Sequence, residues 1–571
     1  MRIEQRPLPE NLPDLGDLPP LLTRIYAARG VRSTAELEKG LAYLLPVHLL
    51  KGMDAAVQLL AQALEQRQRI LIVGDFDADG ATASCVGMLG LQMLGAAHVD
   101  YLVPNRFDYG YGLTPEIVAV ALERQPDLLV TVDNGISSVE GVAAAQAAGL
   151  KVLVTDHHLP GHTLPSADAI VNPNQPGCEF PSKALAGVGV MFYVLLGLRA
   201  HLRSSGWFAQ QNIAEPNLAE LLDLVALGSV ADVVPLDANN RILVHQGLAR
   251  IRAGRARPGL RAILEVARRD HRRIVSTDLG FIVGPRLNAA GRLDDISLGI
   301  ECLLCEDADD ALQRAQQLEQ LNQDRKQIEQ GMQQEALVQL KDLPVEGLPF
   351  GLCLFEPEWH QGVIGILASR MKERYHRPVI AFADADNGEL KGSARSIPGL
   401  HIRDTLDAIA ASFPELISKF GGHAMAAGLT INKQHYEAFA EAFDAQVRSQ
   451  LTADDLTGCI YSDGCLADHE FDMQLAQQLR HAGPWGQRFP EPLFHGDFKI
   501  LSQRLVGERH LKMVLQSSRS APPVDAIAFN IDVDVWPNPN ILEARVAYTL
   551  DVNEFRGNET LQLIVSSLTP L

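Results

Sequence analysis

Four short stretches of this sequence place carboxylate or imidazole groups directly after an apolar run. They are GDFDADG, TVDNG, TDHH and GSVADVVPL, and their chemistry-bearing residues are Asp75, Asp77, Asp79, Asp133, Asp156, His157, His158 and Asp232. Carboxylates and imidazoles together suit a divalent ion such as manganese or magnesium. So many carboxylates in one place repel each other, and bound cations remove that cost. The pattern predicts a site for two divalent cations, Mn2+ or Mg2+, which is the standard device for phosphodiester hydrolysis.

Each stretch has a simpler interpretation when it stands alone. D-x-D-x-D-G is typical of a calcium-binding loop of the EF-hand type, but position 12 of such a loop is Glu and here it is Val86. TVDNG alone fits a tight turn, and TDHH alone fits a helix cap followed by two surface histidines. The occurrence of all four stretches in one chain favours the metal site.

The elements that must position these residues alternate between strand and helix from about residue 55 to residue 240. Short apolar runs at 70–73, 101–103, 128–132, 152–154 and 169–171 predict strands, with helical stretches such as 139–148 between them. This alternation predicts a parallel sheet covered on both faces. Ligands of such sheets bind beyond the carboxyl ends of the strands. If the strands are neighbours, we expect the acids and histidines to converge on one rim.

The whole chain divides into five expected segments. They are a Pro-rich lead-in (1–50), a catalytic domain (51–300), a connector (301–344), a smaller α/β domain (345–452) and an all-β domain (453–571). The connector contains one long helix at 307–340, and its largely polar surface is expected of a helix that joins two lobes. Strand-like segments at 511–515, 526–529, 546–550 and 561–565 fit a small OB-type barrel. The expected fold class is α/β, with two lobes, a connecting helix and this barrel.

The composition is that of a soluble protein with several domains, since 47% of the 571 residues are hydrophobic and 21% are charged. The formal net charge of -20 argues against nucleic-acid binding. The local field matters more than the sum, however, and a carboxylate site adds negative charge that cations cancel. Residues 250–273 form a basic stripe of nine arginines with only two acids, Glu265 and Asp270. The stripe is either a solvated helix face or a surface near the path of DNA.

The cysteines and the apolar runs indicate in which cellular compartment the protein is expected. Cys302 and Cys305 have C-x-x-C spacing without a second pair or a nearby histidine, so reduced buried thiols are expected rather than zinc. The N-terminus has no apolar core of signal-peptide type. The longest mostly apolar run, at 184–198, is shorter than the roughly 20 residues that span a bilayer, and it predicts a buried helix. We expect a cytoplasmic protein with no membrane partner. A monomer is expected because one chain supplies two lobes and a barrel.

The four stretches, in this order, resemble the four motifs of the DHH phosphoesterases. GPRLNAAGRLDD at 284–295 then resembles the branch of that family that digests single-stranded DNA from its 5′ end. EWHQGVIGI at 358–366, KGSARS at 391–396 and GGHAMAAG at 421–428 resemble the DHH-associated domain. The resemblance covers roughly residues 50 to 450. It implies a metal-dependent 5′→3′ exonuclease for single-stranded DNA that serves repair and recombination. It also implies that the OB-type domain associates with single-stranded-DNA-binding protein, although this domain could instead offer a platform for single-stranded DNA.

The resemblance also implies roles for single residues. The metal ligands it implies are Asp75, Asp77, Asp79, Asp133, His157 and Asp232. Asp79 and Asp133 are the residues expected to touch or bridge both ions. His158 is expected to contact the scissile phosphate or assist the leaving group, and Asp156 to orient the histidines.

Further candidates could hold the DNA strand or its 5′-phosphate. They are Arg106, Arg286, Ser393, Arg395, Ser396, Gly422 and His423. A guanidinium suits bidentate phosphate contact, although pairing with a motif carboxylate is the alternative for both Arg106 and Arg286. The Gly-rich run offers amides to an anion, but such a run alone also indicates tight packing. Phe107, Tyr109 and Tyr111 either stack bases or pack within their loop.

Two other functions stay open. One is a DHH phosphodiesterase or phosphatase for small substrates, although such relatives look more compact and lack the connector and the barrel. The other is a non-catalytic scaffold that binds single-stranded DNA, against which the intact set of acids and histidines argues. For the exonuclease, a channel between lobes that admits only a single strand would explain strand selectivity.

Overall fold

Five parallel strands form the sheet that carries the metal-site stretches. They are β2 (Arg69–Val73), β3 (His98–Leu102), β4 (Leu128–Val132), β5 (Lys151–Thr155) and β6 (Ala169–Val171). The order across the sheet is β3–β2–β4–β5–β6, and every neighbouring pair is parallel. The sequence therefore located all five strands to within three residues at each end. Because β2, β4 and β5 are adjacent, their carboxyl ends share one rim.

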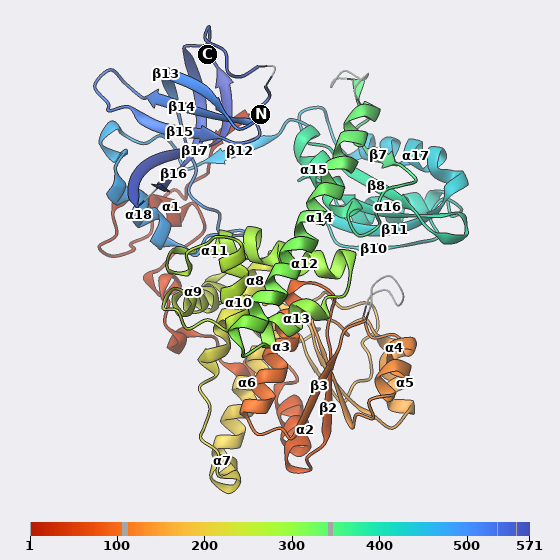
Figure 1. Cartoon of the computed structure of the whole chain (residues 1–571). Coiled ribbons are helices and arrows are strands. Elements are labelled where there is room, and N and C mark those ends of the chain that lie inside the picture. The colour runs from red at the N-terminus through yellow and green to blue at the C-terminus, as the bar shows by residue number, and fades with distance from the viewer. Residues whose placement is uncertain (1, 105–111, 341–346, 534, 556) are drawn as a thin grey trace. The chain divides into compact units, whose positions relative to one another are not determined.

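The computed structural model describes residues 2–104, 112–340, 347–533, 535–555 and 557–571 (Figure 1). The chain forms two units. Unit 1 contains Met1–Glu4 and Leu321–Ile460, and unit 2 contains Gln5–Gln320 and Tyr461–Leu571. The catalytic sheet and the C-terminal barrel therefore belong to the same unit, although more than a hundred residues of unit 1 separate them in the sequence.

Helices cover both faces of the parallel sheet (Figure 1). One face packs on α4 (Pro115–Leu122) and α5 (Val139–Ala147), where Ile117 and Val142 meet Leu71, Val73 and other strand residues. The other face packs on α3 (Ala78–Met93) and α6 (Gly187–Ser204), with α2 (Met53–Glu65) beside α6. Burial on both faces explains why these strands are continuous apolar runs rather than alternating ones.

The remaining elements of the catalytic part are helical. They are α1 (Pro20–Ala27), η1 (Thr34–Leu37), η2 (Leu41–Tyr43), η3 (Val47–Leu49), α7 (Trp207–Gln211), η4 (Leu218–Leu221), α8 (Leu222–Ala231), α9 (Ala238–Arg252), α10 (Pro258–Val266), η5 (His271–Arg273), α11 (Ser276–Asp278), the π-helical turn η6 (Leu279–Val283), α12 (Gly284–Leu293) and α13 (Ser297–Leu304). The apolar run expected at 184–198 is the start of α6, which is mostly buried. No single helix among the described residues is long and apolar enough to cross a membrane. The bent helix pair Leu41–Leu49 and Met53–Glu65 is long and apolar enough when its two helices are taken together.

The long connector helix is present as α14 (Ala308–Leu340). Asp307 begins it, because its Oδ1 accepts the backbone N–H groups of Asp309 and Asp310 at 2.9 and 3.0 Å. Leu318 is fully buried in unit 2, whereas in unit 1 Arg325 pairs with Glu329, which also binds Arg370 at 3.0 Å. The boundary between the units falls inside this helix, between Gln320 and Leu321.

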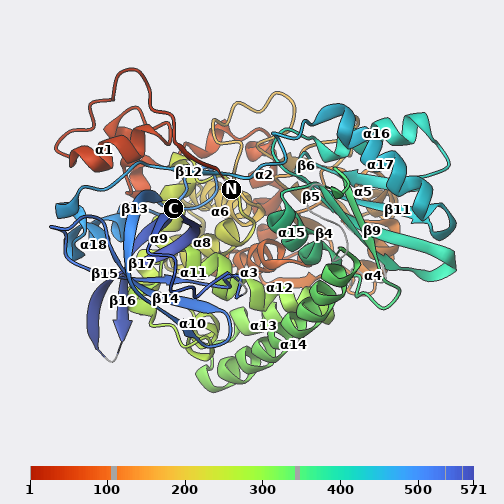
Figure 2. The same cartoon turned by 90° about the horizontal axis from the view of Figure 1, so that it is seen from above.

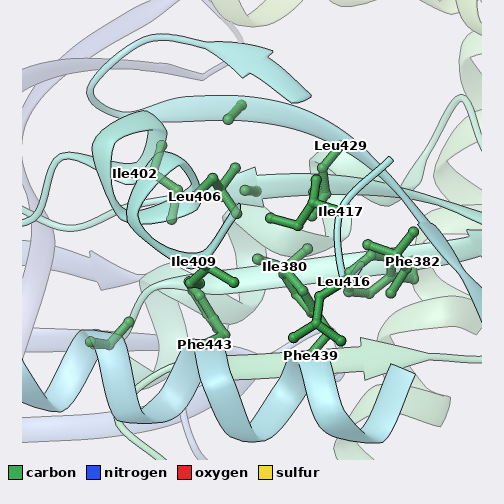
Figure 3. Close-up of a cluster of buried hydrophobic side chains, with 14 of the residues drawn as sticks. Ile380, Phe382, Ile402, Leu406, Ile409, Leu416, Ile417, Leu429, Phe439 and Phe443 are labelled. Atoms are coloured by element: carbon green, nitrogen blue, oxygen red, sulfur yellow. The ribbon is translucent and has the colours of Figure 1, made fainter. Parts of the chain in front are cut away.

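Unit 1 is built on a mixed sheet in the order β10–β11–β9–β8–β7. Its elements are β7 (Leu352–Phe355), α15 (Ile364–Tyr375), β8 (Val379–Asp384), η8 (Asp386–Gly388), β9 (Glu389–Arg395), α16 (Ile402–Ser412), β10 (Lys419–Gly422), β11 (Ala426–Asn432), η9 (Lys433–His435) and α17 (Tyr436–Gln450). Phe439 and Phe443 of α17 pack on Ile380 and Phe382 of β8 to form its core (Figure 3). The second α/β domain expected from the sequence is thus present.

The C-terminal part is a closed five-stranded barrel. Its strands are β13 (Phe494–Val506), β14 (His510–Gln516), β15 (Val524–Ala528), β16 (Glu543–Phe555) and β17 (Asn558–Pro570), in the order β13–β14–β15–β17–β16. The pairing of β13 with β16 closes the ring of strands. The barrel follows α18 (Met473–Ala482) and η10 (Asp468–Glu470), and Figure 2 shows it beside α18. The OB-type expectation is confirmed, although the sequence did not indicate β13.

The N-terminal segment is tied to the segment that precedes the barrel. β1 (Arg2–Gln5) pairs with β12 (Cys459–Ser462) in a two-stranded sheet. The Arg29 guanidinium donates to both oxygens of Asp463 at 2.8 and 2.9 Å, and both side chains are only 1% exposed. The Tyr26 hydroxyl donates to the carbonyl of Ala482 at 2.8 Å. From Gln5 onward, the lead-in is therefore an integral part of unit 2.

Candidate metal centre

The loop after β2 carries three of the predicted ligands and starts helix α3. Asp77 caps that helix, because its Oδ1 accepts the N–H groups of Asp79 and Gly80 at 2.9 and 3.0 Å. Asp75 and Asp79 are almost fully buried, at 6% and 1% exposure. Asp79 accepts the N–H groups of Gly187 and Val188 at 2.6 and 3.0 Å, in the first turn of α6. A helix N-terminus stabilises the charged carboxylate there.

Asp133 lies directly after β4 in the left-handed backbone conformation, with a φ of 61°. Aspartate tolerates this conformation better than most residues. The neighbouring Asn134 side chain donates to the carbonyls of Val73 and Val132 at 3.0 and 2.9 Å, which fixes the ends of β2 and β4. A Cβ on Gly187 would lie 2.5 Å from the Asp133 Cβ, so only glycine lets α6 approach this closely.

His157 is the residue around which the acids gather. Its Nε2 lies 3.0 Å from Asp133 Oδ1, 3.5 Å from Asp232 Oδ2 and 3.9 Å from Asp79 Oδ2. Asp232 comes from the C-terminal end of helix α8 and not from the sheet. Three groups have ligand atoms within 4.8 Å of one another: Asp133, His157 and His158; Asp79, His157 and Asp232; Asp75, Asp77 and Asp133. The structure thus brings all eight motif residues, including Asp156 through its contact with His158, to one place.

Asp156 binds the histidine segment rather than joining the acid cluster. Its Oδ1 lies 2.7 Å from Nδ1 of His158 and accepts the N–H groups of His157 and His158 at 2.7 and 3.1 Å. Its Oδ2 accepts the N–H of Ile136 at 2.9 Å. Burial opposes ionisation of Asp156, but the hydrogen bond and charge of His158, together with His157 and the N–H of Ile136, outweigh it and lower the pKa of this carboxyl. Burial likewise opposes the charge on His158, yet Asp156 and the other acids raise its pKa to about 9.

The electrostatics of the acid cluster fit a site for divalent cations. Burial, followed by repulsion from Asp77, raises the pKa of Asp79 to about 7. Burial and the neighbouring carboxylates also raise the pKa of Asp133 and of Asp232 well above the ordinary range. The protein's own side chains thus supply too little positive charge to balance these acids. Mn2+ or Mg2+ would supply the missing positive charge, and carboxylate oxygens and imidazole nitrogens are suitable ligands for these ions.

Two residues that support the centre were not singled out in the sequence. Asn288 of α12 accepts the N–H of Ala78 through its Oδ1 at 2.8 Å. A Cβ on Gly291, one turn further on, would lie 2.0 Å from the carbonyl oxygen of Phe76. α12 therefore packs directly on the loop that carries Asp75, Asp77 and Asp79. Both residues lie in GPRLNAAGRLDD, the stretch that also contains Arg286, so the sequence signal for this support is the stretch itself.

Comparisons with known proteins agree with this architecture. Family models match at residues 69–229 (DHH family, N-terminal domain), 348–449 (DHHA1 domain) and 462–567 (RecJ OB domain). The chain is 58% identical over 557 residues to the single-stranded-DNA-specific exonuclease RecJ of Salmonella typhimurium, and the match covers 97% of this chain and 96% of that relative.

The chain belongs to the RecJ family. A crystal structure of RecJ from Thermus thermophilus in complex with Mn2+ is similar over 100% of this chain and 79% of that one, with a TM-score of 0.81 and 31% identity. The Mg2+ complex from the same organism is similar over 100% and 78%, with a TM-score of 0.75 and 29% identity. RecJ proteins have thus been observed with both of the ions that the donor set favours here.

Arg286, a candidate phosphate ligand of this RecJ-family chain, is 7% exposed and engaged by the protein. Its Nε lies 2.5 Å from Oε2 of Glu319 in α14, and its Nη1 donates to the carbonyl of Ile282 at 2.6 Å. Arg286 thus pairs with a carboxylate, which was the alternative to phosphate binding. The acid is Glu319 and not a motif aspartate. Arg106, Phe107, Tyr109 and Tyr111 lie outside the described residues.

In unit 1, Ser393 and Arg395 lie together on β9 of the DHHA1 domain. The Arg395 Nη1 donates to the Ser393 Oγ at 3.0 Å and to the carbonyl of Ala394 at 2.8 Å. Burial lowers the pKa of Arg395, and no described carboxylate forms an ion pair with it. A Cβ on Gly365 would lie 2.9 Å from both Arg395 Nη2 and Ser393 Oγ, so the start of α15 adjoins the pair. Ser396, in contrast, is buried and donates to the carbonyl of Leu400 at 2.8 Å.

The Gly-rich run forms the hairpin of β10 and β11 in the RecJ-family chain. Gly421 pairs with Gly428, which pairs with Ser393 on the next strand, so these three residues form one row across the sheet. Open space lies where a Cβ on Gly421 or Gly428 would point. Gly422 has a φ of 146° and its Cβ would lie 2.4 Å from the carbonyl oxygen of Ala426, so it serves tight packing. His423 is exposed at the turn, and its N–H donates to the same carbonyl at 2.8 Å.

The basic stripe at 250–273 is not one uniform surface. Arg252 and Arg257 donate to the carbonyls of Ile274 and Leu303 at 2.8 and 2.9 Å, and these contacts are structural. Other members are paired with acids, since Arg269, Arg272 and Arg273 contact Asp278, Asp270 and Glu554. Arg255, Arg261 and Arg268 have no such contact with the described residues, and all three are exposed. Only part of the stripe therefore presents positive charge to the solvent.

Proposed function

We propose that this chain is a metal-dependent exonuclease that hydrolyses single-stranded DNA in the 5′→3′ direction by a two-metal mechanism. The observation that carries the proposal is the convergence of Asp79, Asp133 and Asp232 on His157. RecJ relatives that match nearly the whole chain carry the name of single-stranded-DNA-specific exonuclease. We further propose that the enzyme works in the cytoplasm and serves DNA repair and recombination.

The metal ligands proposed are Asp75, Asp77, Asp79, Asp133, His157 and Asp232. Two divalent cations held there supply Lewis-acid chemistry to the attacking and leaving oxygens of phosphodiester hydrolysis. The buried acids create an anionic pocket that repels a bare phosphate, so cation binding and substrate binding are coupled. Asp79 and Asp133 are the most buried of these acids and stay our candidates for contact with both ions.

His158 is proposed to act on the scissile phosphate. Its Nδ1 is held by Asp156, and a pKa of about 9 keeps the ring protonated at neutral pH. A protonated ring can donate from Nε2 to a phosphate oxygen or give that proton to the leaving oxygen as its bond to phosphorus breaks. Asp156 is the positioning residue, because it fixes the ring and holds its charge.

Ser393 and Arg395 are proposed to bind a phosphate of the DNA, with the 5′-phosphate as the first candidate. A partly buried guanidinium without a described carboxylate partner leaves a positive charge that an anion balances. The open row of Gly421 and Gly428 beside Ser393 leaves room for a nucleic-acid backbone. Arg106, Arg286, Ser396, Gly422 and His423 stay predictions as DNA contacts.

The barrel is proposed to dock single-stranded-DNA-binding protein. It exposes several large apolar side chains, namely Leu501, Leu505, Phe529 and Leu542. Exposed apolar side chains of this kind mark protein-interaction sites when they gather in one patch. We also propose that the enzyme is a monomer. The domain limits given above stay predictions.

The proposal is tested with a 3′-labelled single-stranded oligonucleotide and the matching blunt duplex. Each is incubated with Mn2+ or Mg2+, with an EDTA control, the Asp133→Ala variant and the exposed Asp17→Ala variant as a matched control. We expect shortening of the single strand from its 5′ end, abolished by EDTA and by Asp133→Ala and unchanged in Asp17→Ala. A strand that is bound but stays intact would indicate a scaffold. Neither binding nor cleavage would indicate a phosphoesterase for small substrates.

A further inference from the structure

Two exposed large apolar side chains directly follow residues of the metal centre, and a third lies in the π-helical turn η6, which packs on α8. Leu159 follows His158 and is 61% exposed, and Val233 follows Asp232 and is also 61% exposed. Phe281 is 78% exposed, the highest value among the large apolar residues that the structure describes. A single exposed apolar residue has no special meaning, but exposed apolar side chains in segments that adjoin the metal-site residues suit contact with the apolar part of a substrate.

The position of Phe281 follows from the packing of the π-helical turn η6 on the end of α8. A Cβ on Gly280 would lie 3.2 Å from Val230 Cγ1, and one on Gly284 would lie 3.2 Å from the Ala231 Cβ. Phe281 is therefore one residue from a contact with the segment that ends in Asp232. Single π-helical turns occur frequently at functional sites.

A buried guanidinium holds the backbone of this turn. The Nη1 of Arg286 donates to the carbonyl of Ile282, the residue after Phe281, and Glu319 pairs with the same guanidinium. The buried Arg286 thus fixes the backbone beside an exposed aromatic ring. An aromatic ring that serves only packing is covered by neighbouring side chains, whereas the Phe281 ring is exposed.

The backbone at Val233 is strained in a way that also exposes an apolar side chain. Its φ is 60°, in the left-handed region that a β-branched residue rarely adopts. Such strain persists only where the surrounding structure imposes it, and it concentrates at functional sites. Here the chain turns immediately after the ligand candidate Asp232 and leaves Val233 in solvent.

We propose that Phe281 stacks on a nucleobase of the single-stranded substrate beside the metal centre, with Val233 as an apolar neighbour. This inference rests on the proposed exonuclease function. The acid cluster and its cations deal with the phosphate, so the base of the same or an adjacent nucleotide needs an apolar surface. An aromatic face accepts every base, and stacking therefore grips the strand without reading its sequence.

The test combines variants with base-free positions in the DNA. Oligonucleotides carry one tetrahydrofuran residue, which lacks a base, at successive positions from the 5′ end. In the unmodified enzyme we expect one position at which loss of the base raises KM by about 5- to 100-fold, the range expected for base–aromatic stacking. Phe281→Ala should raise KM for normal DNA to a similar extent and show no further penalty at that position. Phe281→Tyr should keep both properties.

The controls separate this inference from the exonuclease proposal. Digestion of normal single-stranded DNA by the unmodified enzyme tests the function itself. Tyr43 is an exposed aromatic residue far from the site in the sequence, at 57% exposure, and Tyr43→Ala should leave KM unchanged. Thermal unfolding checks that Phe281→Ala is folded, as its exposure leads us to expect. An unchanged KM in a folded Phe281→Ala enzyme, or an unchanged tetrahydrofuran penalty in that variant, would overturn the stacking assignment.

Discussion

The carboxylate of Asp156 lies 2.7 Å from Nδ1 of His158 and also accepts the backbone N–H groups of both histidines in the TDHH stretch. This single side chain fixes the ring of one histidine and the backbone of the other. It is buried, and its oxygens are turned toward the histidine segment and Ile136. The four motif stretches therefore contain two kinds of acid. Most surround the proposed cations, whereas Asp156 holds the imidazoles.

Asp156→Asn should lower the pKa of His158 from about 9 toward its ordinary value. The imidazole would then lose its proton at lower pH, so the alkaline limb of the pH–rate profile should move to lower pH. His158→Ala should reduce kcat by about 10²- to 10⁴-fold, the range of general acid–base catalysis. The exposed His162→Ala variant is the control and should behave as the unmodified enzyme. An unmoved alkaline limb in Asp156→Asn would contradict the positioning role.

Asp133→Asn should affect the metal-free and metal-bound proteins in opposite ways. Without cations, the change removes one buried carboxylate from a cluster in which every acid repels the others, so the Tm should rise. With Mn2+, the stabilisation gained by the unmodified protein should be largely lost, since a ligand is missing. Melting curves with EDTA and with Mn2+ measure both effects. The exposed Asp17→Asn should change neither curve, and a lower Tm of metal-free Asp133→Asn would count against the repulsive cluster.

The stability of the metal-free protein should fall as pH rises through the acid and neutral range. The folded-state pKa of Asp79 is about 7 against an ordinary 3.8, so between these values the folded state binds a proton that the unfolded state has lost. One such group lowers the free energy of unfolding by up to about 1.4 kcal/mol for each pH unit. Mn2+ displaces that proton, so its apparent affinity should increase from pH 5 to pH 7. Denaturant titrations and calorimetry measure the two trends, and pH-independent Mn2+ binding would refute the coupling.

Gly291→Ala should damage the metal centre from a distance. Its Cβ would lie 2.0 Å from the carbonyl oxygen of Phe76, so the Asp75–Asp79 loop must shift. We expect a lower Tm and weaker Mn2+ binding by calorimetry. Gly331→Ala is the matched control, because this glycine also lies in a helix and has open space around its Cβ position. That change should raise stability by about 0.5–1 kcal/mol, as expected for an exposed helix position.

Arg395→Ala should weaken the recognition of a 5′-phosphate. We expect KM to rise about 10-fold or more for 5′-phosphorylated single-stranded DNA, because a charge-assisted contact is lost. The KM for the same strand with a 5′-hydroxyl should change much less. Arg403→Ala removes an exposed arginine of the same unit and is the control. Equal effects of Arg395→Ala on both strands would place the arginine at another phosphate or in a structural role.

The sequence predicted the parts of this fold that depend on local patterns. The strands of the parallel sheet are continuous apolar runs, and each ligand of the sheet follows the end of one, so both could be found without the structure. β13 was missed because its buried residues are separated by exposed ones over thirteen residues, a weaker pattern than a fully apolar run. Asp232 was located as a site residue, but the sequence did not show that a helix carries it.

The supporting residues of the site could not be found in the same way. Asn288 holds the loop at Ala78 across 210 residues of sequence, and no local pattern marks such a contact. The same limit applies to Arg286, whose partner Glu319 lies in the connector helix. A guanidinium suits a phosphate and a carboxylate equally well, so only the fold decides between them.

The buried pair of Arg29 and Asp463 has a consequence for how the protein is made. The two residues are 434 positions apart, so the ribosome has produced most of the chain before the acid exists. Until then Arg29 must stay in water or meet a temporary partner, because a buried charge without its counter-ion is strongly unfavourable. The N-terminal segment is therefore the first part synthesised and among the last to settle. A nascent chain stalled before residue 463 should leave this segment open to proteases.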